Sequence, residues 1–296
     1  MREIPLLLLV GPTAVGKTEA SLDLADALGG EIISGDSMQV FRRLDIGTAK
    51  IRPEEMRGIP HHLINIKEPQ ESFSAAEFKT LADEKIKDIA ARGKLPIIVG
   101  GTGFYINSVI YAYHFGDAVE DAAYRKALQA ILEQEGPERL MALLAEVDPQ
   151  SAQRLHPNDT KRIIRALEVY HVTGQPLSAA GSSIDKAHPR YRIVYQALVM
   201  ERPTLYERIN QRVEDMLAAG WLAEVEALLA EGVPRDAQAM QGLGYRQLVD
   251  FLDGRETWER TVELIKRDTR HFAKRQLTWF RHDPNLIWVQ KEHRCV

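Results

Sequence analysis

The stretch Gly11-Pro12-Thr13-Ala14-Val15-Gly16-Lys17-Thr18 decides the fold of this chain. It follows an apolar run at residues 4–10 and leads into the helical pattern of residues 20–28. A strand, a glycine-rich loop and a helix in this order form a phosphate cradle, because the backbone N–H groups point at phosphate oxygens beside the positive end of the helix dipole. Lys17 adds a mobile charge, and the Thr18 hydroxyl suits Mg²⁺. The stretch predicts a di- or triphosphate site; the alternative is a tight glycine turn that binds nothing.

Composition limits the class of protein. The chain has 296 residues, 45% of them hydrophobic, which suffices for one large core or two modest ones. Lys and Arg number 38 against 42 Asp and Glu, and this mild acidity does not exclude a nucleic-acid partner. The single cysteine, Cys295, excludes a disulfide framework and a cysteine-based zinc site. No apolar run reaches membrane-spanning length, so we expect a cytoplasmic protein.

Hydrophobic periodicity divides the chain into three parts. Residues 1–115 alternate buried strands, at 31–34 and 95–99, with helices, one of which begins at the capping box of Ser74 and ends near Arg92. This pattern predicts an α/β fold with a parallel, helix-covered sheet of the P-loop NTPase type. Residues 116–190 show helical spacing and predict an inserted all-helical subdomain. Residues 191–296 return to the core with a strand at 193–200 and continue as helices.

Polar segments follow two of the predicted strands. Asp36 comes just after strand 31–34, at the sheet edge where ligands bind in open parallel sheets. It either accepts a proton from a nucleophile or merely caps the next turn. Strand 95–99 ends in Gly-Gly-Thr-Gly, residues 100–103, where P-loop ATPases carry an aspartate, which argues against NTP hydrolysis. Thr102 lines a second substrate's pocket, or the glycines only allow close packing.

The segment 266–281 contains six Lys or Arg residues and one acid. Its basic residues recur every four positions and form a cationic helix face, which we assign to a polyanion such as RNA. Phe272 and Trp279 suit unstacked bases, but we assign them to the core. His61 and His62 lack metal-ligand spacing, and we expect them to be structural or phosphate-facing.

Together these segments resemble the bacterial tRNA dimethylallyltransferases over almost the entire chain. The pattern specific to that family is Asp36-Ser37 followed by Asp45-Ile46-Gly47-Thr48-Ala49-Lys50. Other matching pieces lie at 11–18, 33–40, 60–64, 99–103, 156–159, 162–168, 244–247 and 274–281. Phe41 and Asn65 depart from the tyrosine and aspartate that the family often has.

The resemblance implies a prenyltransferase that moves the dimethylallyl group of dimethylallyl diphosphate to N6 of adenosine 37 in tRNA and releases diphosphate. Asp36 would accept the N6 proton, with Lys17 and Thr102 as the other catalytic residues and Mg²⁺ bound at Thr18. The adenine must leave the anticodon-loop stack to reach them. The diphosphate-binding residues would be Gly11, Pro12, Thr13, Ala14, Val15, Gly16, Lys17 and Thr18.

The resemblance also implies that the inserted subdomain and the C-terminal helices bind the anticodon stem-loop. Ser37 and Gln39 would read the edge of the target adenine. The predicted tRNA-binding residues are Asp36, Ser37, Met38, Gln39, Arg125, Asp159, Thr160, Lys161, Arg162, Ile163, Gly244, Tyr245, Arg246, Arg270, Lys274, Arg275 and Arg281. We expect a monomer, because no exposed apolar stripe is evident.

Three other functions compete with this interpretation. A small-molecule P-loop kinase shares the fold and would use the inserted subdomain as an arginine-bearing lid; protection from heat by dimethylallyl diphosphate rather than ATP separates the two. An isopentenyltransferase acting on free AMP or ADP has no use for the basic C-terminal helix. An RNA-binding module without chemistry has no use for Asp36 beside the phosphate loop.

Overall fold

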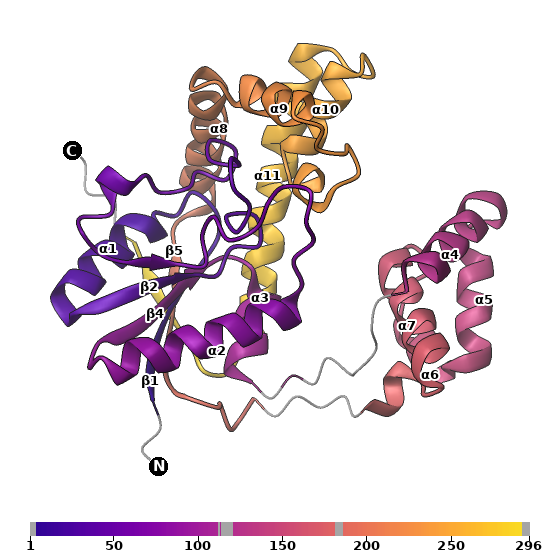
Figure 1. The fold of residues 1–296 in the computed structure, drawn as a ribbon, viewed down its shortest axis with the longest axis horizontal. Coiled ribbons are helices and arrows are strands. Elements are labelled where there is room, and N and C mark those ends of the chain that lie inside the picture. The colour runs from indigo at the N-terminus through magenta and orange to yellow at the C-terminus, as the bar shows by residue number, and fades with distance from the viewer. Residues whose placement is uncertain (1–3, 112, 114–120, 181–185, 292–296) are drawn as a thin grey trace. The chain divides into compact units, whose positions relative to one another are not determined.

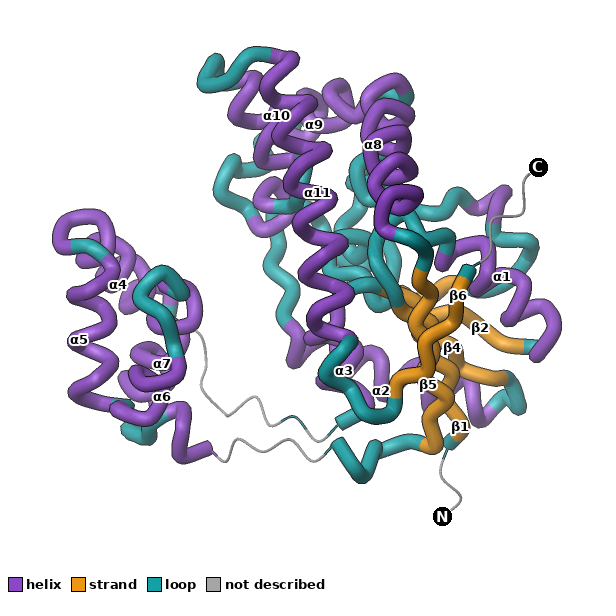
Figure 2. The backbone as a smooth tube through the Cα atoms, turned by 180° about the vertical axis from the view of Figure 1, so that it is seen from behind, coloured by secondary structure: helices purple, strands orange, loops and turns teal. Residues whose placement is uncertain are grey.

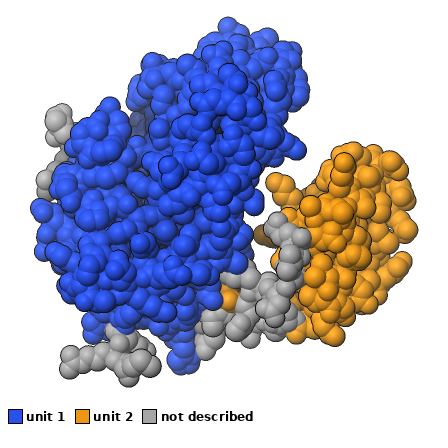
Figure 3. Space-filling model, viewed as in Figure 1, with its two compact units in different colours: residues 1–112, 185–296 blue, residues 113–184 orange. Residues whose placement is uncertain are grey.

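The computed structural model describes residues 4–111, 113, 121–180 and 186–291. The chain forms two compact units, one of residues 1–112 with 185–296 and one of residues 113–184 (Figure 3). The second unit corresponds to the predicted insertion, but it begins at 113 rather than 116 and ends at 184 rather than 190.

A six-stranded parallel sheet organises the first unit, in the order β3-β2-β4-β1-β5-β6. Four of its strands agree with the predicted ones: β1 (Pro5–Val10), β2 (Gly30–Ser34), β4 (Leu95–Gly100) and β5 (Arg192–Val199). The two outermost strands, β3 (His61–His62) and β6 (Leu286–Gln290), were not predicted. The first has only two residues and the second is partly exposed, so neither shows the continuous apolar run of a buried strand.

Helices α1 (Lys17–Leu28), α2 (Ala75–Ala91) and α3 (Gly103–Ile110) accompany the first strands. The predicted capping box is present, because the Ser74 hydroxyl accepts from the Glu77 N–H at 3.2 Å and the Glu77 carboxylate accepts from the Ser74 N–H at 3.3 Å. The 3₁₀ turn η1 (Pro53–Glu55) lies between β2 and β3. After β5 come α8 (Arg202–Ala218), α9 (Trp221–Ala230), the 3₁₀ turn η3 (Gln238–Gln241), α10 (Tyr245–Leu252) and α11 (Trp258–Phe280). Helices α8, α9 and α10 lie beyond the carboxyl ends of the strands, and α11 runs from there alongside the sheet to α3 (Figures 1 and 2).

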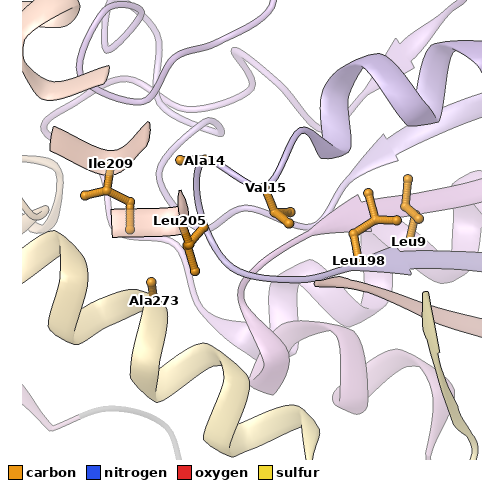
Figure 4. Close-up of a cluster of buried hydrophobic side chains, with 7 residues drawn as sticks. All are labelled: Leu9, Ala14, Val15, Leu198, Leu205, Ile209 and Ala273. Carbon is orange, nitrogen blue, oxygen red and sulfur yellow. The ribbon is translucent and has the colours of Figure 1, made fainter. Parts of the chain in front are cut away.

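A hydrophobic cluster fixes the phosphate loop to these late helices (Figure 4). Val15 of the loop is fully buried and lies in one cluster with Leu205 and Ile209 of α8 and Ala273 of α11. Elements more than 180 residues apart in the sequence therefore pack as one body. The polar groups of α8 and α11 are thereby held at the phosphate site.

The second unit contains α4 (Ala122–Glu135), α5 (Pro137–Val147), α6 (Pro149–Arg154), α7 (Thr160–Thr173) and η2 (Leu177–Ala180). Leucines of α4 and α5 pack on α7 to form its own core. Glu168 is fully buried there and pairs with Arg125 at 2.7 Å and Arg165 at 2.6 Å. Burial raises the pKa of this carboxyl, but the hydrogen bonds from both arginines outweigh it and hold the pKa below its ordinary value.

None of the helices in the described part of the chain combines the length and the apolar character needed to cross a bilayer.

Candidate active site

The phosphate loop lies between β1 and α1, as the sequence predicts. Gly11 has φ 141°, and a Cβ there would lie 2.6 Å from the Leu198 carbonyl oxygen, so the close approach of β5 requires glycine. The Lys17 ammonium donates to the carbonyl oxygens of Gly11 at 2.9 Å and Pro12 at 2.8 Å. The pKa of Lys17 is lowered to about 7, because burial and the Arg212 charge lower it more than the Asp36 carboxylate raises it.

Asp36 follows β2 on the same sheet edge as the loop. Its Oδ1 accepts from the N–H groups of Met38 at 2.8 Å and Gln39 at 3.4 Å, so it does cap the next turn. No hydrogen bond to Oδ2 is found among the described residues, and the carboxylate still lines a cavity. The two interpretations of Asp36 are therefore compatible: one oxygen shapes the turn and the other faces the site.

The loop after β4 meets the Asp36 turn. The Thr102 hydroxyl accepts from the Ser37 N–H at 3.2 Å, which brings Thr102 and Ser37 to one wall of the site. Gly100 packs directly on Gly35, since a Cβ would lie 2.4 Å from the Gly35 carbonyl oxygen. The two interpretations of segment 100–103 therefore apply to different residues: Thr102 lines a cavity, and Gly100 allows close packing.

Two cavities share Asp36 in their walls. A phosphate compartment of about 130 Å³ is lined by the loop, including Lys17 and Thr18. An apolar compartment of about 270 Å³ is lined by Ile209, Val213, Met216, Trp221 and Leu243, among others. Both cavities are lined by Thr13, Asp36, Thr48, Arg212 and Phe272. The arrangement places one carboxylate between a polar, anion-binding space and a space suited to an apolar or aromatic group.

Arg212 of α8 is a site residue that the sequence reasoning missed. It is half-buried; burial lowers its pKa, whereas the Asp36 carboxylate raises it. Arg208, one turn earlier, donates to the Ala14 carbonyl oxygen at 3.0 Å. The only sequence signal was two arginines four positions apart on a helix, which is also the pattern of an ordinary solvated face.

Gln276 of α11 was matched in the sequence but assigned no role. Its side-chain oxygen accepts from the Thr13 N–H at 2.9 Å, and its amide nitrogen donates to the Gly101 carbonyl oxygen at 3.1 Å. A Cβ at Gly101 would lie 2.0 Å from that nitrogen. One buried amide therefore holds the phosphate loop and the loop after β4 at a fixed spacing.

The chain is similar in sequence to a family of known enzymes. The model of the IPP transferase family matches residues 39–283. A tRNA dimethylallyltransferase of Symbiobacterium thermophilum is 56% identical over 287 residues, 97% of this chain and 89% of the relative. A tRNA dimethylallyltransferase of Geobacillus thermodenitrificans is 51% identical over 283 residues, 96% of this chain and 89% of the relative. The chain belongs to the tRNA dimethylallyltransferase family.

Solved structures agree with this membership. The full-length tRNA isopentenylpyrophosphate transferase of Bacillus halodurans superposes with a TM-score of 0.72 at 47% identity, covering 97% of this chain and 90% of that one. A eukaryotic dimethylallyltransferase described as acting on tRNA gives a TM-score of 0.79 at 29% identity, covering 97% and 73%. The predicted family, its P-loop α/β fold and the enzyme class of prenyltransferase are confirmed.

The motif specific to the dimethylallyltransferase family builds a wall of the site. The Glu224 carboxylate of α9 accepts from the N–H groups of Asp45, Ile46 and Gly47, at 2.9, 2.7 and 3.2 Å. The buried Lys50 ammonium donates to the Asp45 carboxylate at 2.7 Å, and burial lowers its pKa. This motif therefore shapes the loop that closes the apolar compartment.

Several of the predicted tRNA-binding residues form part of this wall. The Gln39 amide accepts from the Ser34 hydroxyl at 2.9 Å and donates to the Thr48 carbonyl oxygen at 3.2 Å. Tyr245 is 1% exposed, and its hydroxyl donates to Glu224 at 2.6 Å. A Cβ at Gly244 would lie 1.9 Å from the Trp221 ring, so that glycine is required for packing. Arg246, by contrast, is exposed.

In the second unit of this dimethylallyltransferase, the structure corrects the prediction for one tRNA-binding residue, Ile163. Ile163 is fully buried in the helical core, so its side chain has no surface to offer to tRNA. Arg125 is paired with Glu168. Asp159, Lys161 and Arg162 are exposed at the start of α7, with Thr160 half-buried beside them.

Fewer basic residues of α11 are available to a polyanion than the sequence predicts, because three of them have partners within the protein. Arg270 donates to the Asn210 side chain at 2.6 Å, Lys266 pairs with Glu214 and Arg267 pairs with Asp268. The exposed basic residues of its second half are Lys274 and Arg275, with Arg281 at the end of the helix.

The assignment of both α11 aromatics to the core is wrong. Trp279 is 38% exposed, and Phe272 is half-buried and lines both compartments. The two histidines, in contrast, have structural partners: His62 contacts the Glu31 carboxylate at 2.8 Å, and His61 contacts the Ile59 carbonyl oxygen at 2.9 Å. Among the described residues, no group of three His, Cys, Asp or Glu side chains could hold a metal ion.

Proposed function

We propose that this chain transfers the dimethylallyl group of dimethylallyl diphosphate to the N6 amine of adenosine 37 in tRNA. The observation that carries the proposal is Asp36, which lines the phosphate compartment and the apolar compartment at once. A donor with its diphosphate on the loop and its five-carbon chain among apolar side chains has its reactive carbon at this junction. A kinase, by contrast, has no need of an apolar space beside its terminal phosphate.

The chemical step is a displacement at C1 of the donor. The N6 lone pair forms the new C–N bond, the C1–O bond breaks and its electron pair leaves on the diphosphate oxygen. Asp36 Oδ2 takes the N6 proton. Lys17, Arg212 and the N–H groups of the loop stabilise the charge that develops on the leaving diphosphate, a contribution that is usually the largest in such sites.

Thr18 fits the predicted role of a Mg²⁺ ligand. Its side chain lines the phosphate compartment, and Mg²⁺ binds through one or two protein ligands, substrate phosphates and retained waters rather than an all-protein cage. When bound there, the ion would neutralise charge on the diphosphate. We propose that the Thr18 hydroxyl holds it beside the loop.

Five exposed basic residues are proposed to contact the tRNA backbone. They are Lys274, Arg275 and Arg281, at the end of α11, and Lys161 and Arg162, at the start of α7. Arg246 joins them beside the apolar compartment. We propose a monomeric, cytoplasmic enzyme, as the sequence predicts.

The function is tested by the product. The protein is incubated with Mg²⁺ and dimethylallyl diphosphate, together with unmodified tRNA, AMP or ADP in parallel, and the nucleosides are analysed by mass. A five-carbon adduct on the adenosine of tRNA alone supports the proposal. An adduct on AMP or ADP instead favours the free-nucleotide isopentenyltransferase, and transfer of a γ-phosphoryl group from ATP favours the kinase.

The low pKa of Lys17 predicts how donor capture depends on pH. The protonated form binds the diphosphate and predominates below about pH 7 in the free enzyme, so kcat/KM for dimethylallyl diphosphate should fall above that pH, by up to ~10-fold per pH unit. Lys17→Arg should move this fall out of the accessible range, because arginine stays protonated. An unchanged kcat/KM between pH 7 and 9 would contradict the assignment.

Salt dependence tests the basic face of α11. Lys274→Gln combined with Arg275→Gln should weaken tRNA binding and lower the slope of log Kd against log salt by about 1.5, since each phosphate contact contributes roughly 0.7 to 0.9. Lys87→Gln combined with Lys94→Gln, both exposed elsewhere on the first unit, serves as the matched control. Equal slopes for the two double variants would remove Lys274 and Arg275 from the interface.

A further inference from the structure

We infer that a row of side chains on α11 and α3, formed by Phe272, Arg275, Trp279 and Phe104, stacks the nucleobases that flank the target adenosine. The inference rests on the proposed function, because it needs an RNA substrate whose target base has left its stack. The four side chains are called the stacking row below.

The stacking row begins in the site. Phe272 lines both compartments together with Asp36. The Arg275 guanidinium lies 5.9 Å from the centroid of the Phe272 ring. Phe272, Arg275 and Trp279 follow at spacings of three and four residues, which places them along one face of the helix.

The far end of the stacking row joins α11 to α3. The Trp279 ring lies edge to face with Phe104, with centroids 6.3 Å apart and an interplanar angle of 86°. A Cβ at Gly103 would lie 2.1 Å from Cδ1 of Trp279, so the indole rests directly on the backbone next to Thr102. Thr102 itself lines the apolar compartment. The row is thus continuous with the entrance to the site.

The exposure and the charge of the stacking row indicate which kind of molecule binds it. Phe104 is 42% and Trp279 38% exposed, although both are large aromatic side chains. Arg275 lies between the aromatics, with exposed Lys274 beside it and Arg281 two residues beyond Trp279. Residues 269–281 contain no acidic side chain. Aromatic faces interleaved with cations match a single strand that carries phosphates and unpaired bases.

The chemistry of the proposed reaction creates such a strand. Extruding the target adenine breaks its stacking on both neighbours, which costs a few kcal/mol unless the enzyme replaces those contacts. The exposed rings of the stacking row offer replacements one step outside the pocket. Exposed aromatic and basic side chains alone would not identify a partner. Because the stacking row lies near Asp36, we assign it to the loop of the RNA that delivers the adenine.

Substitution of Trp279 tests the inference. Trp279→Ala should raise KM for tRNA by about 10- to 100-fold, the range of one lost base–aromatic stack, with KM for dimethylallyl diphosphate unchanged. Trp279→Phe should restore most of the affinity, because it keeps an aromatic face. Trp258→Ala is the matched control, since Trp258 packs edge to face on Phe251 at the first turn of α11 and lies outside the row. A rise in both KM values, unrepaired by phenylalanine, would overturn the inference.

An anticodon stem-loop with an abasic residue next to the target adenosine, on either side in turn, provides the second test. If Trp279 stacks on that base, Trp279→Ala should cost little on the abasic substrate that lacks its partner and the full amount on the intact one. Equal costs on all three substrates would show that Trp279 does not act through a base. If the parent enzyme forms no adduct on any of them, the proposed function itself fails, which is a different result from turnover that is indifferent to Trp279.

Discussion

Asp36→Asn is expected to lower kcat by about a hundredfold to ten-thousandfold, the usual contribution of a positioned general base. The amide oxygen can still accept from the Met38 N–H, which Asp36 Oδ1 now does at 2.8 Å, so the turn after β2 should remain intact. Binding of tRNA should stay close to the parent value. Single-turnover formation of the prenylated nucleoside, with both substrates saturating, measures the chemical step directly.

One indirect effect of this substitution has to be separated. The Asp36 carboxylate raises the pKa of Lys17, so its removal moves that pKa below about 7 and deprotonates part of Lys17 at neutral pH. The rate should therefore be measured at about pH 6 as well, where Lys17 stays protonated. A deficit that persists there belongs to the lost base, and a deficit that disappears belongs to Lys17. Asp23→Asn, an exposed carboxylate on α1 paired with Arg57, is the control.

The parts of the fold that depend on residues close together in the chain could be predicted from the sequence. The phosphate loop, four buried strands and the capping box at Ser74 each depend on residues within a few positions of one another. The meeting of Asp36 and Thr102 was also predictable, because the carboxyl ends of parallel strands share one edge of the sheet. The edge strands β3 and β6 were missed, since a strand with one open side needs no continuous apolar run.

Contacts of long sequence separation account for what was missed in the site. The hydrogen bond from the Thr13 N–H to Gln276 spans 263 positions, and Arg212 reaches Lys17 and Asp36 only because α8 packs on the loop. Trp279 was misassigned because a helical stripe of aromatics has the same spacing whether it faces a core or a ligand. Neither the role of Arg212 nor the environment of Trp279 can be predicted without knowing which helix lies against the loop.

The contacts of Lys50 explain why the chain tolerates Asn65, where the family often has aspartate. Lys50 is buried and donates to the Asn65 side-chain oxygen at 2.7 Å, as it also does to Asp45. An asparagine supplies the same acceptor as the aspartate that the family often has at this position. The residues that distinguish the sequence pattern thus hold the loop in place, while Asp36 and the phosphate loop supply the proposed chemistry.

Arg212→Ala is expected to lower kcat by about a hundredfold to a thousandfold, the cost of removing one preorganised donor from a site of developing charge. The side chain lines both compartments, so its charge can follow the diphosphate as the C1–O bond breaks. Arg212→Lys should recover only part of the rate, because an ammonium lacks the planar fork that matches phosphate oxygens. Steady-state kinetics with inhibition by free diphosphate would measure both effects.

The same variant has a second consequence that a merely structural arginine would not produce. Arg212 lowers the pKa of Lys17, so Arg212→Ala should raise that pKa above about 7 and move the alkaline fall of kcat/KM for the donor to higher pH. Arg202→Ala, on the same helix but exposed and stacked on Tyr206, should change neither kcat nor the pH profile. A reduced rate together with the shifted profile would place Arg212 beside Lys17 and the diphosphate, whereas an unshifted profile would place its effect elsewhere.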